Sequence, residues 1–178
     1  MILPLTNSLF KEIYNEYMKV DFPPDELKPC SRILKQKKAG IALTLGYYDG
    51  NQLVGYAVIE QDAAQQILLL DYFAILPQFR QQGKGTLFLS EIKYMFSNVK
   101  CIFIETEAPI HPTAIRRLEF YLHAGARKTT IQVNLFHVDY LILTLNNNCS
   151  DDENLILLKE IYDTIYPAFF RKNYLKYY

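Results

Sequence analysis

The first forty residues place apolar side chains at the spacing of amphipathic helices. We expect a short strand over residues 1–6 and a helix over residues 8–20, capped by Ser8. A proline-rich break follows this helix. The pattern then predicts a second helix over residues 26–38, which Gly40 would end.

Beyond residue 40 the apolar positions follow the shorter period of β-strands. Strands are predicted over residues 41–48 and 53–61, joined by the turn signal Asp49-Gly50-Asn51. The aliphatic run at residues 67–76 predicts a central strand. After this run the pattern predicts a helix, a strand, a second helix and an antiparallel strand pair, at residues 86–97, 101–106, 113–123, 128–136 and 139–145.

The C-terminal part of the chain begins with a capping box, formed by Ser150 and Glu153. It predicts a last helix that ends near Tyr166, before Pro167. The aromatic segment 168–178 is unusual for a free end, and we expect it to pack on its own domain, with the second subunit of a homodimer as the alternative. The order of elements predicts an α/β fold with a mixed, mostly antiparallel sheet.

Composition supports a single folded domain over residues 1–178. Hydrophobic residues make up 50% and charged residues 21%, which excludes a disordered or low-complexity chain. Lys and Arg together number 19, as do Asp and Glu, so we expect no general attraction to nucleic acid or acidic membranes. No signal peptide or membrane span is evident, and we expect a cytoplasmic protein. Cys30, Cys101 and Cys149 are too far apart to suggest a disulfide framework or a metal site.

The segment with the clearest chemistry covers residues 76–86, where an apolar strand gives way to a helix. Gly83 and Gly85 let the backbone approach a ligand, and the N–H groups and dipole of the helix start form a cradle for phosphate. Arg80 would add a planar cation suited to phosphate oxygens. Lys84 would either add a second positive charge at the phosphate or point into solvent. The glycine spacing fits neither a P-loop nor a Rossmann fingerprint, and a plain turn with two glycines is the remaining alternative.

This segment resembles the acetyl-CoA-binding signature [QR]-x-x-G-x-[GA] of the GCN5-related N-acetyltransferase (GNAT) family, here Arg80-x-x-Gly83-x-Gly85. Residues 118–126, L-E-F-Y-L-H-A-G-A, are similar to the family's second motif, an aromatic–Tyr pair on a helix followed by a glycine. The expected strand order over residues 41–145 also resembles that of the family. The resemblance implies a GNAT fold with a V-shaped splay in the sheet, helices on both faces, and here an extra C-terminal helix within residues 150–178.

The resemblance also implies where acetyl-CoA binds, with no metal involved. Its pyrophosphate would lie on the N–H groups of the glycine loop and its pantetheine arm along the preceding strand, while residues 1–40 would form the acceptor side. Many members carry an Asn that contacts the pantetheine where this chain has Ala114, so that contact must be absent or supplied otherwise. The implied cofactor-binding residues are Phe73, Ala74, Ile75, Arg80, Gln81, Gln82, Gly83, Lys84, Gly85 and Thr86.

The implied reaction is direct acyl transfer from a thioester to an amine. An alkylammonium with a pKa of about 10.4 loses its proton at pH 7 at a cost of about 4.6 kcal/mol, so a base matters more than an acid. A backbone N–H near Ile75 or Leu76 would stabilise the negative oxygen of the thioester. Tyr121, matched to the family's tyrosine, is the expected acid, and a purely structural core aromatic residue is the alternative.

Asp71 is the first candidate for the base. It lies within an apolar strand, where alternation places it on the same face as Phe73 and Ile75 and where a charge is costly unless it is paired or used. We expect Asp71 to be catalytic and to contact a cationic acceptor.

Glu105 and Glu107 lie near the end of the next strand and share one face of it. We expect Glu105 to be catalytic and Glu107 to bind the substrate, so that both line an acidic acceptor pocket with Asp71. The alternative for both glutamates is a structural ion network with Arg116 and Arg117.

These expectations favour an acetyl-CoA-dependent N-acetyltransferase that acts on a primary amine of a small cationic molecule. A protein or peptide N-acetyltransferase and a non-catalytic acyl-CoA sensor of the same fold are the alternatives. A nucleotide-binding oxidoreductase lacks the glycine spacing it would need.

Overall fold

The computed structural model describes all residues from 1 to 178 and contains one eight-stranded sheet. Its strands are β1 (Ile2–Pro4), β2 (Ala42–Asp49), β3 (Gln52–Gln61), β4 (Ile67–Ile75), β5 (Cys101–Glu107), β6 (Arg127–Leu135), β7 (Val138–Leu145) and β8 (Leu175–Tyr177). They lie in the order β1-β2-β3-β4-β5-β7-β6-β8. All neighbours are antiparallel except β4 and β5, which confirms the predicted mixed and mostly antiparallel sheet.

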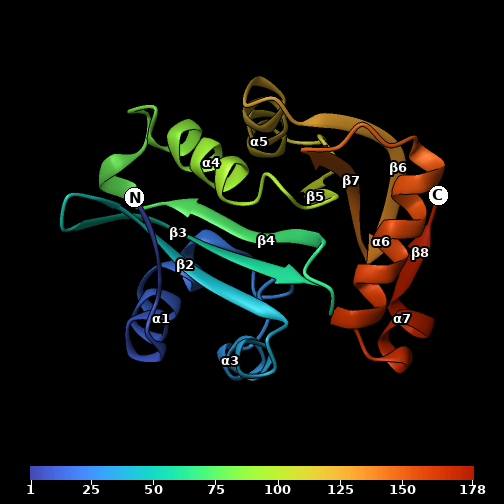
Figure 1. The fold of residues 1–178 in the computed structure, drawn as a ribbon, viewed down its shortest axis with the longest axis horizontal. Coiled ribbons are helices and arrows are strands. Elements are labelled where there is room, and N and C mark those ends of the chain that lie inside the picture. The colour runs from blue at the N-terminus through green and yellow to red at the C-terminus, as the bar shows by residue number, and fades with distance from the viewer.

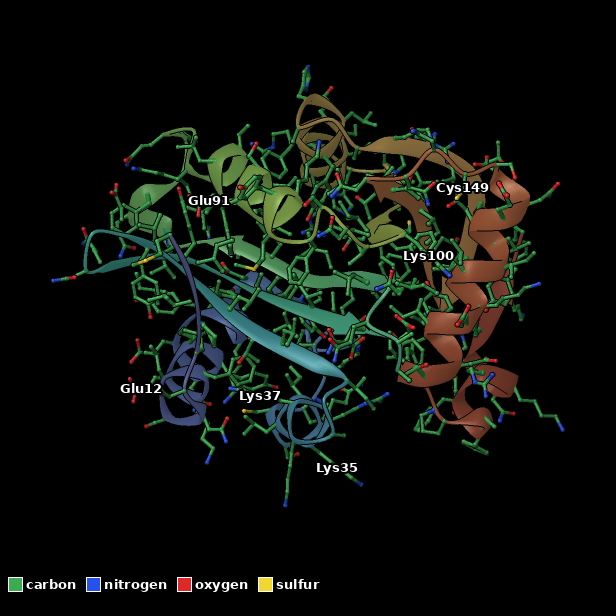
Figure 2. All side chains as sticks on the ribbon, viewed as in Figure 1. Glu12, Lys35, Lys37, Glu91, Lys100 and Cys149 are labelled. Atoms are coloured by element: carbon green, nitrogen blue, oxygen red, sulfur yellow. The ribbon has the colours of Figure 1, made fainter.

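Helices cover both faces of this sheet (Figure 1). They are α1 (Asn7–Ile13), α2 (Lys19–Asp21), α3 (Cys30–Lys38), α4 (Lys84–Met95), α5 (Pro112–His123), α6 (Asp151–Ile165) and α7 (Ala168–Tyr174). Helices α4 and α5 lie on one face, α1 and α3 below β2 and β3, and α6 against the half formed by β5 to β8 (Figure 1). Charged side chains such as Glu12 and Lys35 point outward from α1 and α3, so the apolar faces of these helices are left for the sheet (Figure 2).

The two central strands separate halfway along their length. Strands β4 and β5 pair only from Ile67 opposite Cys101 to Leu70 opposite Ile104. Beyond that point β4 continues beside β3, and β5 continues beside β7. The sheet therefore opens into a wedge at this place, which confirms the expected V-shaped splay.

A β-bulge marks the start of the wedge. Leu70 pairs with Ile59 and Tyr72 with Val58, so Asp71 is the extra residue on β4. Asp71 and Tyr72 both bond to Lys28, whereas Phe73 packs into the core under α4. The expectation that Asp71 shares a face with Phe73 and Ile75 is therefore wrong, because the bulge interrupts the alternation on which it was based.

The predicted second helix starts later than its sequence pattern indicates. Helix α3 begins at Cys30 with Pro29 as its N-cap, and residues 22–29 form a loop. A residue that precedes a proline is disfavoured in helical conformation, so Lys28 cannot easily extend the helix toward its N-terminus. This loop crosses the open end of the wedge and supplies side chains to the site described below.

The C-terminal aromatic segment packs on its own domain, as expected. Helix α7 is followed by β8, which adds to the outer edge of the sheet and pairs with β6 from Val133 to Leu135. Phe136 contacts Tyr166, Phe170 and Tyr174 at ring-centroid distances of 5.5–6.0 Å. None of the helices has the length and apolar composition needed to cross a membrane.

Candidate active site

A groove of about 480 Å³ runs between the splayed end of β4, the N-terminal end of α4 and the second half of α5. We call it the amide groove. It contains every predicted cofactor-binding residue except Gln82, whose side-chain amide instead donates to the Gln78 carbonyl. The predicted residues that line it are Phe73, Ala74, Ile75, Arg80, Gln81, Gly83, Lys84, Gly85 and Thr86.

The turn before α4 presents consecutive backbone N–H groups without protein acceptors. The N–H groups of Gln81, Gln82 and Gly83 donate to no carbonyl of the chain. The first bond of α4 runs from the Leu87 N–H to the Gly83 carbonyl, so the N–H groups of the preceding turn of helix are also free. Gln81 at φ +61° and Gly83 at φ +72° are left-handed, a pattern that turns successive N–H groups toward one side and creates a site for an anion.

Gly85 is needed for close packing at the same turn. A Cβ atom at this position would lie 3.2 Å from the Phe120 ring and 3.6 Å from Ile75. A larger side chain would therefore push α4 away from α5 or fill the groove between them. The two glycines of the motif thus have different roles, since Gly83 supplies backbone conformation and Gly85 supplies space.

The two cations predicted to contact phosphate are engaged at the rim of the groove. Arg80 donates through Nη2 to Asp21 at 2.5 Å and through Nε to the Ile75 carbonyl at 2.8 Å. Lys84 lies 2.5 Å from the Asp49 carboxylate in the β2–β3 turn. Their predicted contacts with phosphate stay a prediction, and the free N–H groups are the donors that the fold itself presents.

The free edge of β4 forms one wall of the amide groove. The Leu76 N–H donates to the Val54 carbonyl at 2.9 Å, so it is not available to a ligand. In an antiparallel ladder, alternate residues direct their N–H and carbonyl groups to opposite sides of the strand. Leu76 faces β3, so Ile75 and Phe73 direct theirs toward the wedge. Of the two donors expected for a thioester oxygen, the Ile75 N–H is therefore the one that remains.

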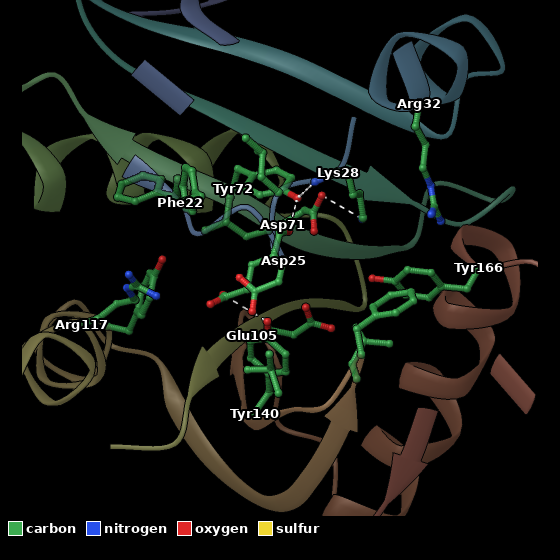
Figure 3. A pocket seen from close by; sticks show the side chains of 18 residues that line it. Phe22, Asp25, Lys28, Arg32, Asp71, Tyr72, Glu105, Arg117, Tyr140 and Tyr166 are labelled. Carbon is green, nitrogen blue, oxygen red and sulfur yellow. Dashed lines mark hydrogen bonds and ion pairs between the residues drawn. The ribbon is translucent and has the colours of Figure 1, made fainter. Parts of the chain in front are cut away.

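A second pocket, of about 200 Å³, adjoins the amide groove on the far side of the wedge. It is enclosed by the loop 22–29, by β4 and β5, and by the β6–β7 hairpin (Figure 3). We call it the acidic pocket, after the carboxyl groups of Asp25, Glu26, Asp71 and Glu105 in its lining. Phe73, Arg117 and Tyr121 line both cavities, so the two meet at these side chains.

Tyr121 therefore lies where the predicted acid should lie. Only 6% of its surface is exposed, and its ring packs beside those of Phe73 and Phe120. Burial raises the pKa of the Tyr121 hydroxyl to about 12, although the nearby charge of Arg117 acts in the opposite direction. The hydroxyl thus keeps its proton at neutral pH.

Asp71 reaches the acidic pocket but is bound to a buried lysine. Lys28 Nζ lies 2.9 Å from Asp71 Oδ2 and 2.7 Å from Glu60 Oε2. Burial lowers the pKa of Lys28, but the two carboxylates outweigh this effect and raise the pKa above its ordinary value. Burial and the negative charge of Asp71 raise the pKa of Glu60 to about 7, in spite of the lysine.

Glu105 lines the acidic pocket, and Glu107 lies just outside it. The Tyr162 hydroxyl of α6 donates to Glu105, and burial raises the pKa of this carboxyl to about 7. Glu107 lies 3.7 Å from Arg117 and 3.2 Å from the imidazole of His111. Of the ion network considered for both glutamates, only the pair of Glu107 with Arg117 forms, whereas Arg116 contacts Thr113 and Glu105 pairs with neither arginine.

The loop 22–29 supplies site residues that the sequence pattern did not reveal. Glu26 and Lys28 both line the acidic pocket, although this segment was expected to be helical from residue 26. The segment P-P-D-E-L-K-P, which brackets charged residues between prolines, is the signal that would have predicted a loop. Arg117 was considered only for the ion network, but it lies four positions before Tyr121, which places both on one face of α5.

Comparison with known proteins gives a consistent result. The model of the Acetyltransferase (GNAT) family matches residues 8–123. No curated protein shows significant sequence similarity to the chain.

Solved structures share the fold at low sequence identity. A protein assigned to the GNAT family from Bacteroides thetaiotaomicron is 19% identical, with a TM-score of 0.72 over 93% of this chain and 98% of its own. The ribosomal-protein-S18-alanine N-acetyltransferase from Escherichia coli is 16% identical, with a TM-score of 0.63 over 85% and 97% of the two chains. A variant of the spermidine N-acetyltransferase from Vibrio cholerae is 13% identical, with a TM-score of 0.63 over 82% and 92%. The family match and the shared fold together show that this chain belongs to the GNAT family of acetyltransferases, enzymes that use acetyl-CoA as co-substrate.

Proposed function

We propose that this protein transfers an acetyl group from acetyl-CoA directly to a primary amine of a small cationic molecule. The observation that carries the proposal is the junction at Tyr121, where a groove of free backbone N–H groups meets a pocket rich in carboxyl groups. One cavity offers donors for an anionic nucleotide, and the other offers negative charge for an ammonium group.

The residues of the amide groove fit acetyl-CoA. The N–H groups from Gln81 to Thr86 would hold its pyrophosphate, and the free edge of β4 at Phe73 and Ile75 would bond to its pantetheine arm. When bound, acetyl-CoA supplies an activated acetyl group on a sulfur that leaves readily. The Ile75 N–H would stabilise the charge on the acetyl oxygen, and the Tyr121 hydroxyl would donate a proton to the sulfur.

The acidic pocket would select and hold the acceptor. In this proposal Asp71 and Glu105 supply the negative charge that attracts an ammonium group, and Glu107 orients Arg117 at the passage to the groove. Lys28 neutralises one carboxylate, and Arg32 and Arg117 also line the pocket, so the negative charge left for the substrate depends on ionised Glu26 and Glu105, whose pKa values are about 7. The small volume and enclosed position of the pocket favour a small molecule over an extended peptide.

Two measurements test the proposal. Isothermal titration with acetyl-CoA should show one binding site per chain, and desulfo-CoA should compete for it. A library of primary amines, including diamines and polyamines, should then be screened with acetyl-CoA for release of free thiol. Absence of binding heat at millimolar acetyl-CoA, or thiol release that no amine accelerates, would refute the proposed function.

A further inference from the structure

Acyl transfer to an amine needs a group that accepts the ammonium proton, and the acidic pocket holds several carboxyl groups. Asp71 is committed to the Lys28 ammonium at 2.9 Å. Glu105 accepts a hydrogen bond from Tyr162, deep on the side of α6. Glu26 is different, because it lies on the loop that crosses the mouth of the wedge and no cation holds it directly by an ion pair.

Glu26 lines the acidic pocket together with Arg117 and Tyr121, the residues at which this pocket meets the amide groove. Its Oε2 accepts a hydrogen bond from the Tyr140 hydroxyl of β7 at 3.2 Å, which fixes the carboxyl group inside the pocket. Arg117, whose charge acts on Glu26, lines both the acidic pocket and the amide groove. An amine that approaches Tyr121 from the acidic pocket therefore passes the Glu26 carboxyl group.

The loop that carries Glu26 is fastened to the bulged strand. The Lys28 N–H donates to the Tyr72 hydroxyl at 2.8 Å, and that hydroxyl donates to the Glu26 carbonyl at 2.8 Å. These bonds hold the backbone of Glu26, so its position does not depend on its own side chain. Replacement of the carboxylate by an amide should therefore leave the loop in place.

We propose that Glu26 is the general base that removes the proton from the ammonium group of the acceptor. This inference rests on the proposed function. The ammonium N–H proton passes to the Glu26 carboxylate, and the freed lone pair forms the N–C bond as the C–S bond breaks. Tyr121 gives its proton to the departing sulfur and takes the second proton of the nitrogen, and Glu26 then releases its proton to solvent.

The electrostatic surroundings of Glu26 suit this role. Glu107 from β5, Arg117 from α5 and Tyr140 from β7 face it, His111 lies behind Glu107, and Asp25 and Lys28 flank it on its own loop. Burial first, and then the Glu107 carboxylate, raise the pKa of Glu26 to about 7, while Tyr140 and Arg117 act against them. A base of this strength differs from an alkylammonium by about three pKa units instead of the roughly six expected for an ordinary glutamate.

The first test is the pH dependence of turnover. In the wild type, kcat at saturating acceptor should rise with pH through an inflection near 7, because Glu26 must be ionised to act. Glu26→Gln should lower kcat by about 10²–10⁴-fold and remove this inflection, without changing the affinity for acetyl-CoA. Glu105→Gln should keep the inflection, and Glu119→Gln, the same change on the exposed side of α5, should leave both rate and profile unchanged.

The second test needs no acceptor. In protein labelled with carboxyl-¹³C glutamate, the NMR resonances of Glu26, Glu60 and Glu105 should titrate near pH 7. The one that disappears in Glu26→Gln should move to lower pH in Glu107→Gln as the neighbouring negative charge is removed. A Glu26 resonance that titrates at the ordinary value of about 4.3 overturns the proposal. If transfer proceeds but Glu26→Gln keeps the inflection, the base assignment alone fails. If the wild type acetylates no amine, the proposed function fails and the base assignment with it.

Discussion

Lys28 Nζ lies 2.9 Å from Asp71 Oδ2, at the bulge where β4 begins to leave β5. The lysine comes from the loop 22–29, and its ammonium also lies 2.7 Å from Glu60 and 5.2 Å from the centre of the Tyr166 ring. The side chains of both partners are less than one-tenth exposed. The Lys28 ammonium thus connects the loop 22–29 to Glu60 of β3, to Asp71 of β4 and to Tyr166 at the end of α6.

Lys28→Met should strongly destabilise the protein, because it leaves Glu60 and Asp71 buried without a counter-ion. We expect a loss of about 3–5 kcal/mol in the free energy of unfolding at pH 7, measured by urea denaturation. The double variant Lys28→Met, Glu60→Gln should recover part of the lost free energy of unfolding, because it removes one of the unpaired buried carboxylates. Lys35→Met, on the exposed side of α3, is the control, and an equally small effect of both methionine variants would show that the buried ion pair contributes little.

Gly83→Ala should weaken acetyl-CoA binding by more than it weakens the fold. The residue has φ +72° with no atom within 4 Å of an added Cβ, so alanine adds backbone strain of about 1–2 kcal/mol without a clash. Gly40 has φ +73° and equally open surroundings, but it directly follows α3, a helix that lies on the opposite side of the sheet from α4 (Figure 1).

Gly40→Ala is thus a matched control for Gly83→Ala. Both variants should lose similar thermal stability, and only Gly83→Ala should lose affinity in isothermal titration with acetyl-CoA. Equal affinity in the two variants would mean that the conformation of the turn is not needed to hold the nucleotide.

Tyr121→Phe should slow acetyl transfer while leaving acetyl-CoA affinity nearly intact. The expected loss in kcat is up to about 100-fold, at the low end for acid catalysis, because a thiolate is a fair leaving group by itself. Thiol release under saturating acetyl-CoA measures it. Tyr94→Phe on α4, where the side chain is 85% exposed, is the control, and turnover by Tyr121→Phe at the wild-type rate would remove the tyrosine from the mechanism.

Glu105→Gln should stabilise the protein in mildly alkaline solution. The pKa of Glu105 is about 7 in the folded protein, above its ordinary value of about 4.5, so the folded state binds more protons between these two pH values. Stability therefore falls as pH rises through this window. Glutamine takes up no proton, and its amide oxygen still accepts the Tyr162 hydrogen bond.

We accordingly expect Glu105→Gln to exceed the wild type by about 1–3 kcal/mol at pH 8 and to match it near pH 4.5. Urea unfolding at both pH values measures the difference. Glu12→Gln on the outward side of α1 should show no such dependence. A difference between Glu105→Gln and the wild type that does not change with pH would contradict the raised pKa.

Much of the fold could be predicted, because local signals and packing agree along most strands. The turn Asp49-Gly50-Asn51 and the capping box at Ser150 and Glu153 occur where they were expected. The bulge at Asp71 could not be predicted from alternation, since an extra residue changes the facing of a side chain without any change in composition. The predicted helix over residues 26–38 begins four residues before the observed start of α3 at Cys30, because Pro29 disfavours helical conformation in the residue before it.

The amide groove was more predictable than the acidic pocket for a physical reason. Most of the groove is built from one continuous segment, residues 73–86, whose motif is tied to the local geometry of the turn, and α5 adds Arg117, Phe120 and Tyr121. The acidic pocket is assembled from the loop 22–29, two strands, a hairpin and Tyr166, which lie far apart in the sequence. No local pattern could show that Lys28 would bind Asp71 or that Tyr140 would bond to Glu26.

The short strand β8 has a consequence for how the protein behaves in solution. Residues 175–177 pair with residues 133–135 at the C-terminal end of β6, where the strand would otherwise be a bare sheet edge. Loss of these residues would uncover a template on which a second molecule could add its own strand. Strand β8 therefore replaces part of the long edge of β6 by a strand of three residues, and the aromatic residues of α7 that precede it pack on Phe136 in the wall of the acidic pocket.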